Sequence, residues 1–181
     1  KGVPQESGDG RFFITALVGD KVGNLFTLIT RDDAGRRLQG IAVDSLVECT
    51  PMESGPSTLI CGTDAVINPR LEEDSAYPSS STFTYKINKI KDVVTPIFLE
   101  VIALSRTIFQ DIVTKDGSTV KKAEIVVGDE TGEVKMVAWR NLTQILEGIM
   151  PGQRLRLKAV AVQKGRDGNP ILQVKSYSSV E

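Results

Sequence analysis

The stretch GDETGEVKMVAW, residues 128–139, sets the fold of the second half of the chain and ends in its only tryptophan. From Val134 onward the residues alternate in character, and the side chains of a β-strand point to opposite faces at successive positions. Val134, Met136 and Ala138 are therefore expected to face a core. Trp139 shares the opposite face with a glutamate and a lysine. The indole either packs inside or at an interface, or lies open to a flat ligand such as a nucleobase.

Length and composition are those of an ordinary soluble protein. The 181 residues, 40% of them apolar and 25% charged, fit one large domain or two small ones. No run approaches the roughly 18 apolar residues of a membrane helix, and the N-terminus lacks the order of a signal peptide. We expect an intracellular protein without a membrane partner, nuclear if eukaryotic and cytoplasmic if archaeal. Residues 1–10 are expected to be a disordered leader or residues added for expression.

Few of the residues that metal sites and active sites need are present. Histidine is absent and there are two cysteines, Cys49 and Cys61, which excludes the common zinc sites and predicts two reduced thiols. Without histidine, no Ser-His or Cys-His pair exists, so we expect no enzyme, no metal and no cofactor. The acidic groups at residues 32–33 and 72–74 are interpreted as solvated loops.

A repeat is anchored on DDAG, residues 32–35, and DETG, residues 129–132, which lie 97 residues apart. Each D-x-x-G is typical of a type I turn, and each joins two apolar runs, so each unit is expected to contain a hairpin. A β-rich run precedes each hairpin, and two strand-like runs follow it. Between them the second unit has a short helix, capped by Asn141 and ended by Gly148. In the first unit only DSLVE, residues 44–48, remains of that helix.

Three strands, a short helix and two strands are the order of the OB-fold, a five-stranded Greek-key barrel whose ligand face lies on strands two and three. We therefore predict an all-β protein of two tandem OB-folds, each with a short helix between strands three and four. Residues 11–93 are assigned to the first barrel and residues 94–181 to the second.

The paired barrels resemble the central DNA-binding pair of the large subunit of replication protein A and its archaeal relatives. The resemblance covers residues 11–181 and rests on the repeat spacing, the GDETGEVKMVAW hairpin, YPSSSTFTYKI (77–87) and LQVKSYSSVE (172–181). It implies sequence-independent binding of single-stranded DNA in replication, repair or recombination. The partners that it implies are single-stranded DNA and either other subunits of a replication protein A-like complex or repair proteins.

In that family, single-stranded DNA crosses one aromatic platform at the end of strand three and another in the loop before strand five. Trp139 matches the first platform, Lys135 lies four positions earlier on its face, and Lys122 precedes the turn. Stacking on an aromatic contributes about 1–3 kcal/mol per base, and lysines hold phosphates. The last loop lacks an aromatic, so Arg166 is the expected substitute there. Further candidates in this barrel, each either a DNA contact or an ordinary surface or core residue, are Arg106, Phe109, Lys121, Arg140 and Lys164.

The first barrel departs further from the family pattern. Aligning the two hairpins with a one-residue insertion places Val43 at the position of Trp139 and Gln39 at that of Lys135, so platform and cation are both lost. The connection of its first two strands, GDKVGN, is also short. Its remaining candidates are an aromatic before strand five and two arginines by the turn: Tyr77, Arg36 and Arg37.

Charge divides in the same way between the two halves. Residues 1–95 carry ten basic and thirteen acidic residues, and residues 96–181 carry twelve and ten. The net charge of −1 is not that of a strongly basic nucleic-acid-binding protein, so we expect modest affinity centred on the second barrel. The alternative is a protein-interaction scaffold of paired OB-folds in a replication, repair or telomere complex, with Trp139 as an interface anchor. A third candidate is the accessory region of a ligase, a helicase or a transfer-RNA enzyme.

Overall fold

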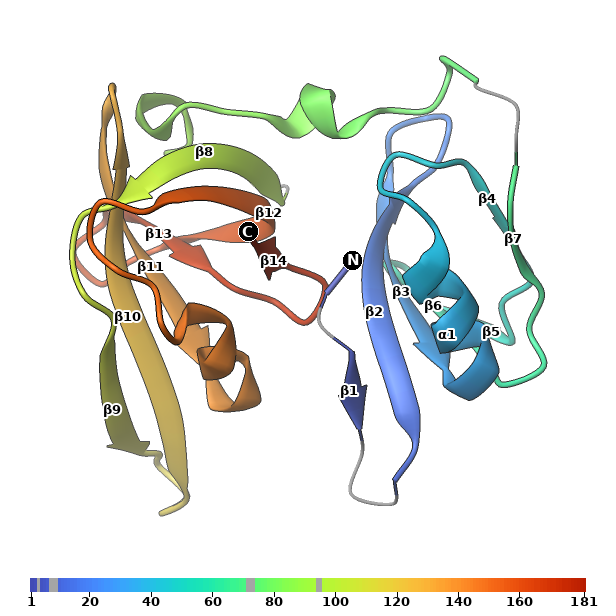
Figure 1. Ribbon diagram of the computed structural model, residues 1–181, viewed down its shortest axis with the longest axis horizontal. Coiled ribbons are helices and arrows are strands. Elements are labelled where there is room, and N and C mark those ends of the chain that lie inside the picture. Colours follow the sequence, from blue (N-terminus) through green and yellow to red (C-terminus); the bar gives the residue numbers. More distant parts are fainter. Residues whose placement is uncertain (3, 7–9, 71–73, 94–95) are drawn as a thin grey trace. The chain divides into compact units, whose positions relative to one another are not determined.

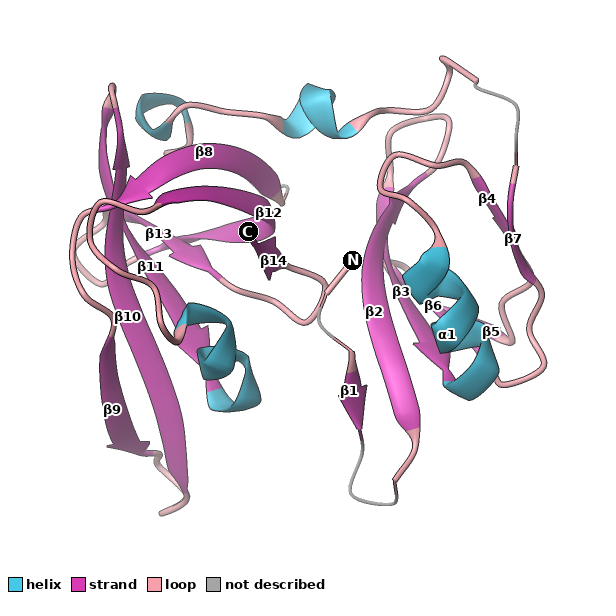
Figure 2. Cartoon of the chain, viewed as in Figure 1, coloured by secondary structure: helices cyan, strands magenta, loops and turns pink. Residues whose placement is uncertain are grey.

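The computed structural model describes residues 1–2, 4–6, 10–70, 74–93 and 96–181. Strands dominate the chain, with a few short helices between them (Figure 2), and the contacts divide it into two compact units, Lys1–Thr82 and Phe83–Glu181. Residues 83–93, which the sequence analysis assigned to the first barrel, therefore belong to the second unit. No helix among the described residues is long and apolar enough to cross a membrane.

The second unit is a closed five-stranded barrel (Figure 1). Strand β8 pairs with β10 and β12, β10 pairs with β11, β11 runs parallel to β13, and β13 returns to β12. This closed circuit confirms the predicted OB-fold, with the helix in its predicted place between the third and fourth strands. The elements are β8 (Ile97–Ala103), β10 (Thr119–Asp129), β11 (Gly132–Trp139), the 3₁₀ helix η3 (Arg140–Leu146), β12 (Arg154–Lys164), β13 (Pro170–Gln173) and β14 (Ser179–Val180).

Strand β9 (Ile108–Val113) follows β8 after a break at residues 104–107 and pairs with the first half of β10. The two strands extend beyond the barrel as an arm on the side where η3 lies (Figure 1). The β-rich run that the sequence predicted before the hairpin, residues 96–109, therefore covers β8, the break and the first two residues of β9.

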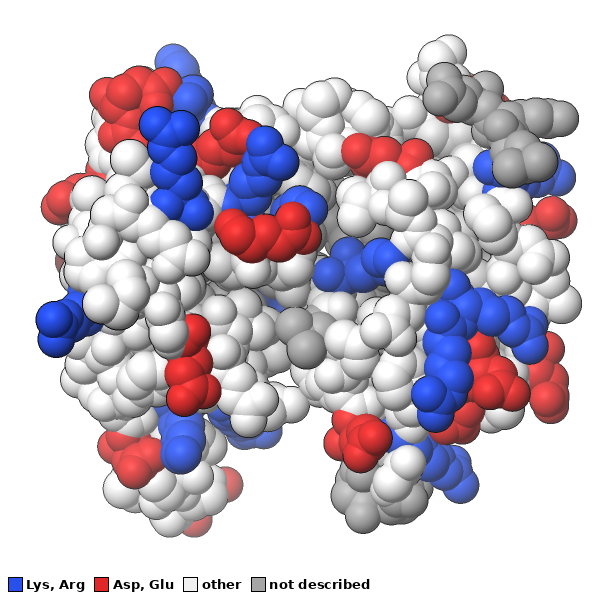
Figure 3. Space-filling model, viewed as in Figure 1, with Lys and Arg blue, Asp and Glu red and all other residues white. Residues whose placement is uncertain are grey.

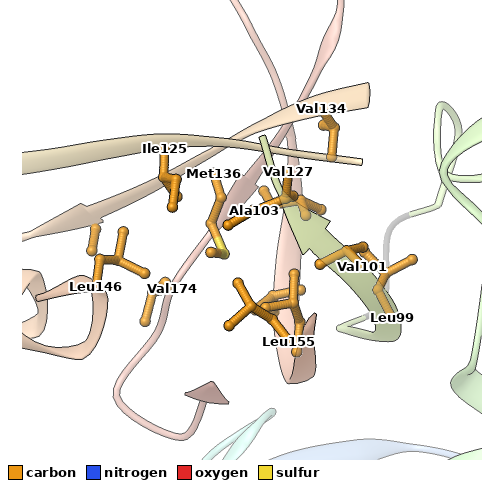
Figure 4. Packing of buried hydrophobic residues seen from close by; sticks show 14 of the residues in the cluster. Leu99, Val101, Ala103, Ile125, Val127, Val134, Met136, Leu146, Leu155 and Val174 are labelled. Atoms are coloured by element: carbon orange, nitrogen blue, oxygen red, sulfur yellow. The ribbon is translucent and has the colours of Figure 1, made fainter. Parts of the chain in front are cut away.

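The alternation that the sequence predicted for β11 forms the barrel core. Val134, Met136 and Ala138 are at most 5% exposed, and Met136 points into the cluster formed by β8, β10 and β12 (Figure 4). The segment before the barrel contributes Ile87, in the 3₁₀ helix η2 (Ile87–Lys89), to the same core. Asp129 of the DETG turn accepts a hydrogen bond from the Ile87 amide at 3.0 Å. The turn therefore joins the barrel to the segment that precedes it.

The first unit repeats part of the order of the second unit, namely two paired strands, a helix and two further paired strands, and its main sheet is open. Its main sheet runs β1 (Gln5–Glu6), β2 (Phe12–Gly19), β3 (Leu25–Arg31), β6 (Thr58–Cys61), β5 (Glu53–Ser54). Helix α1 (Asp32–Gly40) follows β3, and β4 (Val47–Cys49) pairs with β7 (Ile67–Pro69). Within the described ranges no strand of this unit matches β8. The chain then passes through the 3₁₀ turn η1 (Ser80–Phe83).

The predicted hairpin at DDAG is wrong, because these residues begin α1. Asp32 and Asp33 lie in its first turn, where negative charge is favourable, and Ala34 and Leu38, four residues apart, are buried on one face. Glycine at position 35 lets the helix pack closely against Phe12, because an added Cβ would lie 2.8 Å from the Phe12 ring. The helix of the first barrel is thus residues 32–40 and not the DSLVE segment.

The true repeat follows from this correction. Arg31 and Trp139 each end a strand and precede a helix, with nearly the same φ and ψ (−122° and 149°; −126° and 148°). The next residues, Asp32 and Arg140, both have positive φ. β3 pairs in parallel with β6 as β11 pairs with β13. The offset is therefore 108 residues, and GDKVGN is the turn between β2 and β3, the counterpart of the DETG turn.

Three expectations for the first unit change accordingly. Val43 is not the counterpart of Trp139, since it lies after α1 and is 46% exposed; Arg31 occupies that position. Tyr77 follows β7, and the described residues between it and the end of this unit form no strand that it could precede. Of the predicted leader, Gln5 and Glu6 form β1 and pair with β2, while residues 3 and 7–9 lie outside the described residues. The acidic residues at 72–73 also lie outside them.

Candidate nucleic-acid interface

The strand register of the second barrel decides which candidate side chains share a face. Lys122 of β10 lies directly opposite Trp139 of β11, and Val126 lies opposite Lys135. Residues that lie opposite each other in an antiparallel pair project to the same side. Ala123, the neighbour of Lys122 in sequence, is fully buried in the core, so Lys122, Lys135 and Trp139 all lie on the outside of the barrel.

The outer face carries a row of contacts between these side chains. Trp139 is partly exposed, and the Lys122 ammonium lies 5.8 Å from the centre of its indole ring. Lys122 Nζ also donates to Glu124 Oε2 at 2.6 Å, and Lys135 Nζ lies 3.1 Å from Glu124 Oε1. Sequence reasoning missed Glu124, although its position two residues after Lys122 on β10 places it on the same face.

The same face continues onto β13 and the loop before it. Ile171 pairs with Lys135 and Gln173 with Val137 in the parallel ladder. The Lys175 ammonium donates to Gln173 Oε1 at 2.7 Å, and burial lowers the pKa of Lys175. In residues 165–169, the loop between β12 and β13, Arg166 is exposed.

A groove of about 870 Å³ lies on the opposite side of the β9–β10 arm. Phe109 pairs with the core residue Ala123, so its ring, 51% exposed, projects to this side. Lys121 and Arg140 line the groove too, together with Asp111 and Glu147. The predicted site residues therefore divide into two sets on opposite faces. The other lining residues are Gln110, Ser118, Thr119, Val120, Asn141, Thr143 and Gln144.

The other predicted basic residues of this barrel are dispersed. Arg106, in the break between β8 and β9, and Lys164, at the end of β12, are both exposed. On the side of the molecule that Figure 3 shows, lysine and arginine alternate with aspartate and glutamate over both units. This mixture of charges agrees with the near-neutral net charge. Attraction of a nucleic acid would therefore depend on individual contacts and not on a broad positive surface.

In the first unit the predicted cations are engaged within the protein. Arg36 and Arg37 lie on α1 and not beside a turn; the Arg36 guanidinium lies 5.0 Å from the Phe12 ring centre. Arg37 donates to the Ala65 carbonyl at 3.4 Å. Tyr77 has the Lys21 ammonium 5.2 Å from its ring centre. The structure does not bring these residues onto one strand face.

The two cysteines, both free, belong to the first unit. Cys61 is buried, and burial, with a smaller contribution from Cys49, raises the pKa of its thiol to about 11. A thiol so far from ionisation is unreactive at neutral pH. Among the described residues, no three His, Cys, Asp or Glu side chains gather in a group that could hold a metal ion.

Comparisons with known proteins bear on the fold. No family model matches the sequence, and no curated protein does. Among solved structures, the whole chain superimposes on a replication protein A heterotrimer bound to single-stranded DNA, with a TM-score of 0.58 and 16% identity, covering 46% of that chain. The chain has the OB-fold. The same fold is found in a murine DNA-binding protein bound with double-stranded DNA, with a TM-score of 0.55 and 12% identity over 100% of this chain and 90% of that one. It is also found in the Ifi202 HINa domain in complex with a 20 bp duplex, with a TM-score of 0.53 and 16% identity over 99% of this chain and 89% of that one.

Proposed function

We propose that the protein binds single-stranded DNA without sequence preference, through the outer face of β10 and β11, as a non-enzymatic component of replication, repair or recombination. The observation that carries the proposal is Trp139, a partly exposed residue with Lys122 over its ring, at the end of the third strand of a closed barrel. A ring at this position stacks a base of any kind, and the adjacent cations neutralise phosphates.

The likeness in fold supports nucleic-acid binding in general, because the similar structures include complexes with single-stranded and with double-stranded DNA. The geometry of the site favours the single strand. A base in a duplex is already stacked on both sides, whereas Trp139 offers its face only to a base that is free to leave its neighbours. We propose that the large subunit of replication protein A is a functional analogue of this chain.

The test is the fluorescence anisotropy of a labelled oligothymidine of about twelve nucleotides, a length within the reach of one OB-fold. We expect Trp139→Ala to weaken binding by about tenfold, the equivalent of the loss of one stacked base. Phe109→Ala is the matched control, since it removes an exposed ring from the opposite face of the same sheet. It is expected to change the affinity by less than about twofold. Unlabelled RNA and duplex DNA serve as competitors, and duplex that competes as well as the single strand would refute the proposal.

A second candidate function is a protein-interaction scaffold. Three large apolar side chains of β9, those of Ile108, Phe109 and Val113, are 56%, 51% and 70% exposed. In the described part of the chain β9 pairs with β10 alone, so it is an edge strand of the kind that pairs with a partner. A substitution on β9, Val113→Lys, that abolishes the capture of a partner subunit while DNA binding persists would favour this function.

A further inference from the structure

The outer face of the second barrel holds one carboxylate between its two central lysines. Lys122 Nζ lies 2.6 Å from Oε2 of Glu124, and Lys135 Nζ lies 3.1 Å from Oε1. Each carboxylate oxygen thus receives one ammonium group. The three side chains come from neighbouring strands, β10 and β11, whose ladder fixes their spacing.

This cluster is partly withdrawn from water. The side chains of Lys122 and Glu124 are 21% and 24% exposed, and that of Lys135 is 50% exposed. Burial by itself would disfavour the charge on Glu124, but the hydrogen bonds from Lys122 and Lys135 outweigh it and lower the pKa of the carboxyl. Glu124 is therefore ionised at neutral pH, and both ammonium groups already have an anionic partner.

The same contacts bear on the aromatic ring. The ammonium group of Lys122, which Glu124 holds, lies over Trp139 at 5.8 Å from the ring centre. A base that stacks on this side of the indole has to displace the ammonium group. A phosphate that approaches Lys122 or Lys135 competes with the carboxylate for the ammonium group, because each ammonium is already paired with an oxygen of Glu124.

We propose that Glu124 is an internal counter-ion, which occupies both lysines in the free protein and competes with the phosphates of a bound strand for them. The inference rests on the proposed function and deepens it. It predicts modest affinity for a face with two lysines and an indole, because part of the favourable contact with phosphate offsets the loss of two ion pairs. It also implies a shallow salt dependence, because lysines neutralised from within release fewer counterions from the DNA.

The test compares Glu124→Gln with the wild-type protein and with Glu133→Gln, in oligothymidine anisotropy titrations at several salt concentrations. Gln keeps the shape of the side chain and removes its charge. Glu133→Gln is the control because it removes the same charge from the same barrel, while the Glu133 carboxylate forms no ion pair among the described residues. Glu124→Gln is expected to bind roughly three- to tenfold more tightly, as two partly exposed ion pairs predict. Its slope of log K against log salt is expected to steepen by about 0.7 for each lysine released, while Glu133→Gln changes little.

Equal or weaker binding by Glu124→Gln would overturn the inference, because Glu124 would then merely orient the lysines. An equal gain from Glu133→Gln would overturn it as well, since the effect would be one of net charge. Glu124→Asp provides a second variant if Glu124→Gln does not fold: its shorter carboxylate cannot reach both lysines, and an intermediate gain is expected. Absence of binding by the wild-type protein would refute the proposed function itself, which distinguishes the two failures.

Discussion

Asp129 offers the sharpest test of how the second barrel is held together. Its Oδ1 accepts hydrogen bonds from the Thr131 amide and hydroxyl at 2.7 and 2.5 Å, and its Oδ2 accepts one from the amide of Ile87 at 3.0 Å. The first two close the turn between β10 and β11, and the third fastens the segment that carries Ile87 into the core. Asp129→Ala removes all three acceptor contacts at once.

The expected cost follows from these contacts. A hydrogen bond to a charged group contributes about 1.5–3 kcal/mol to the free energy of unfolding when its donor is shielded from water. In a solvent-accessible turn the contribution is about half of that or less. The Ile87 contact belongs to the first kind and the Thr131 contacts to the second. We therefore expect Asp129→Ala to lower the free energy of unfolding by about 2–4 kcal/mol. With a slope of about 1–3 kcal/mol per molar urea, the midpoint falls by about 1–2 M.

The assay is urea unfolding followed by the fluorescence of Trp139, which lies in the second unit and so reports on that barrel. The control is Asp116→Ala, which removes a turn carboxylate from the exposed loop after β9, where Thr114 and Ser118 donate to it. Its midpoint is expected to stay nearly unchanged. A shift no larger for Asp129→Ala than for Asp116→Ala would refute the reasoning.

The pH dependence of the same variant has a defined sign. Burial opposes the ionisation of Asp129, but the hydrogen bonds from Thr131 and Ile87 prevail and place its folded pKa below the ordinary 3.8. A carboxyl whose pKa is lower in the folded state stabilises the protein above the unfolded pKa and loses that contribution as the pH falls through the folded one. The stability difference between wild type and Asp129→Ala is therefore expected to shrink below about pH 3.8.

Two further predictions concern the first unit and the outer face. Leu38→Ala removes a buried side chain of α1 that packs in the same core as Cys61, so we expect a loss of about 2–4 kcal/mol in the first unit. Thiol labelling of Cys61, slow in the wild type, should accelerate while the Trp139 unfolding transition changes little; unchanged labelling would contradict the role of α1. Lys135→Ala in the Glu124→Gln background, where no carboxylate pairs with Lys135, should weaken oligothymidine binding and make its salt slope shallower by about 0.7. An unchanged slope in that background would show that Lys135 contacts no phosphate.

Much of the second barrel could be predicted because its signals are local. The alternation of Val134, Met136 and Ala138 identified the inward face of β11, and these side chains are buried. The D-x-x-G turn there is real, because Asp129 has a backbone amide two residues on to bind. The short helix before Gly148 was also predictable, although Trp139, and not Asn141, occupies its N-cap position.

The first unit shows where the same signals fail. D-x-x-G is also compatible with the first turn of a helix, and the buried pair Ala34 and Leu38, at helical spacing, was the evidence that favoured α1. Misplacing this one element shifted the later assignments, so that Val43 was aligned with Trp139 in place of Arg31. Glu124 was missed for another reason. Its spacing from Lys122 on one strand put the two side chains on the same face, but its contact with Lys135 depends on the register of β10 and β11, which no local pattern specifies.

The central claim is that Trp139 receives an unpaired base on the outside of the second barrel. The most direct measurement is the emission of this single tryptophan during a titration with oligothymidine, followed by addition of salt. We predict that the emission is quenched as the oligonucleotide binds, that salt reverses the quenching, and that Glu124→Gln shifts the midpoint to lower oligonucleotide concentration. Emission that stays constant while anisotropy of a labelled oligothymidine reports binding would contradict the claim, because the strand would then lie away from the indole.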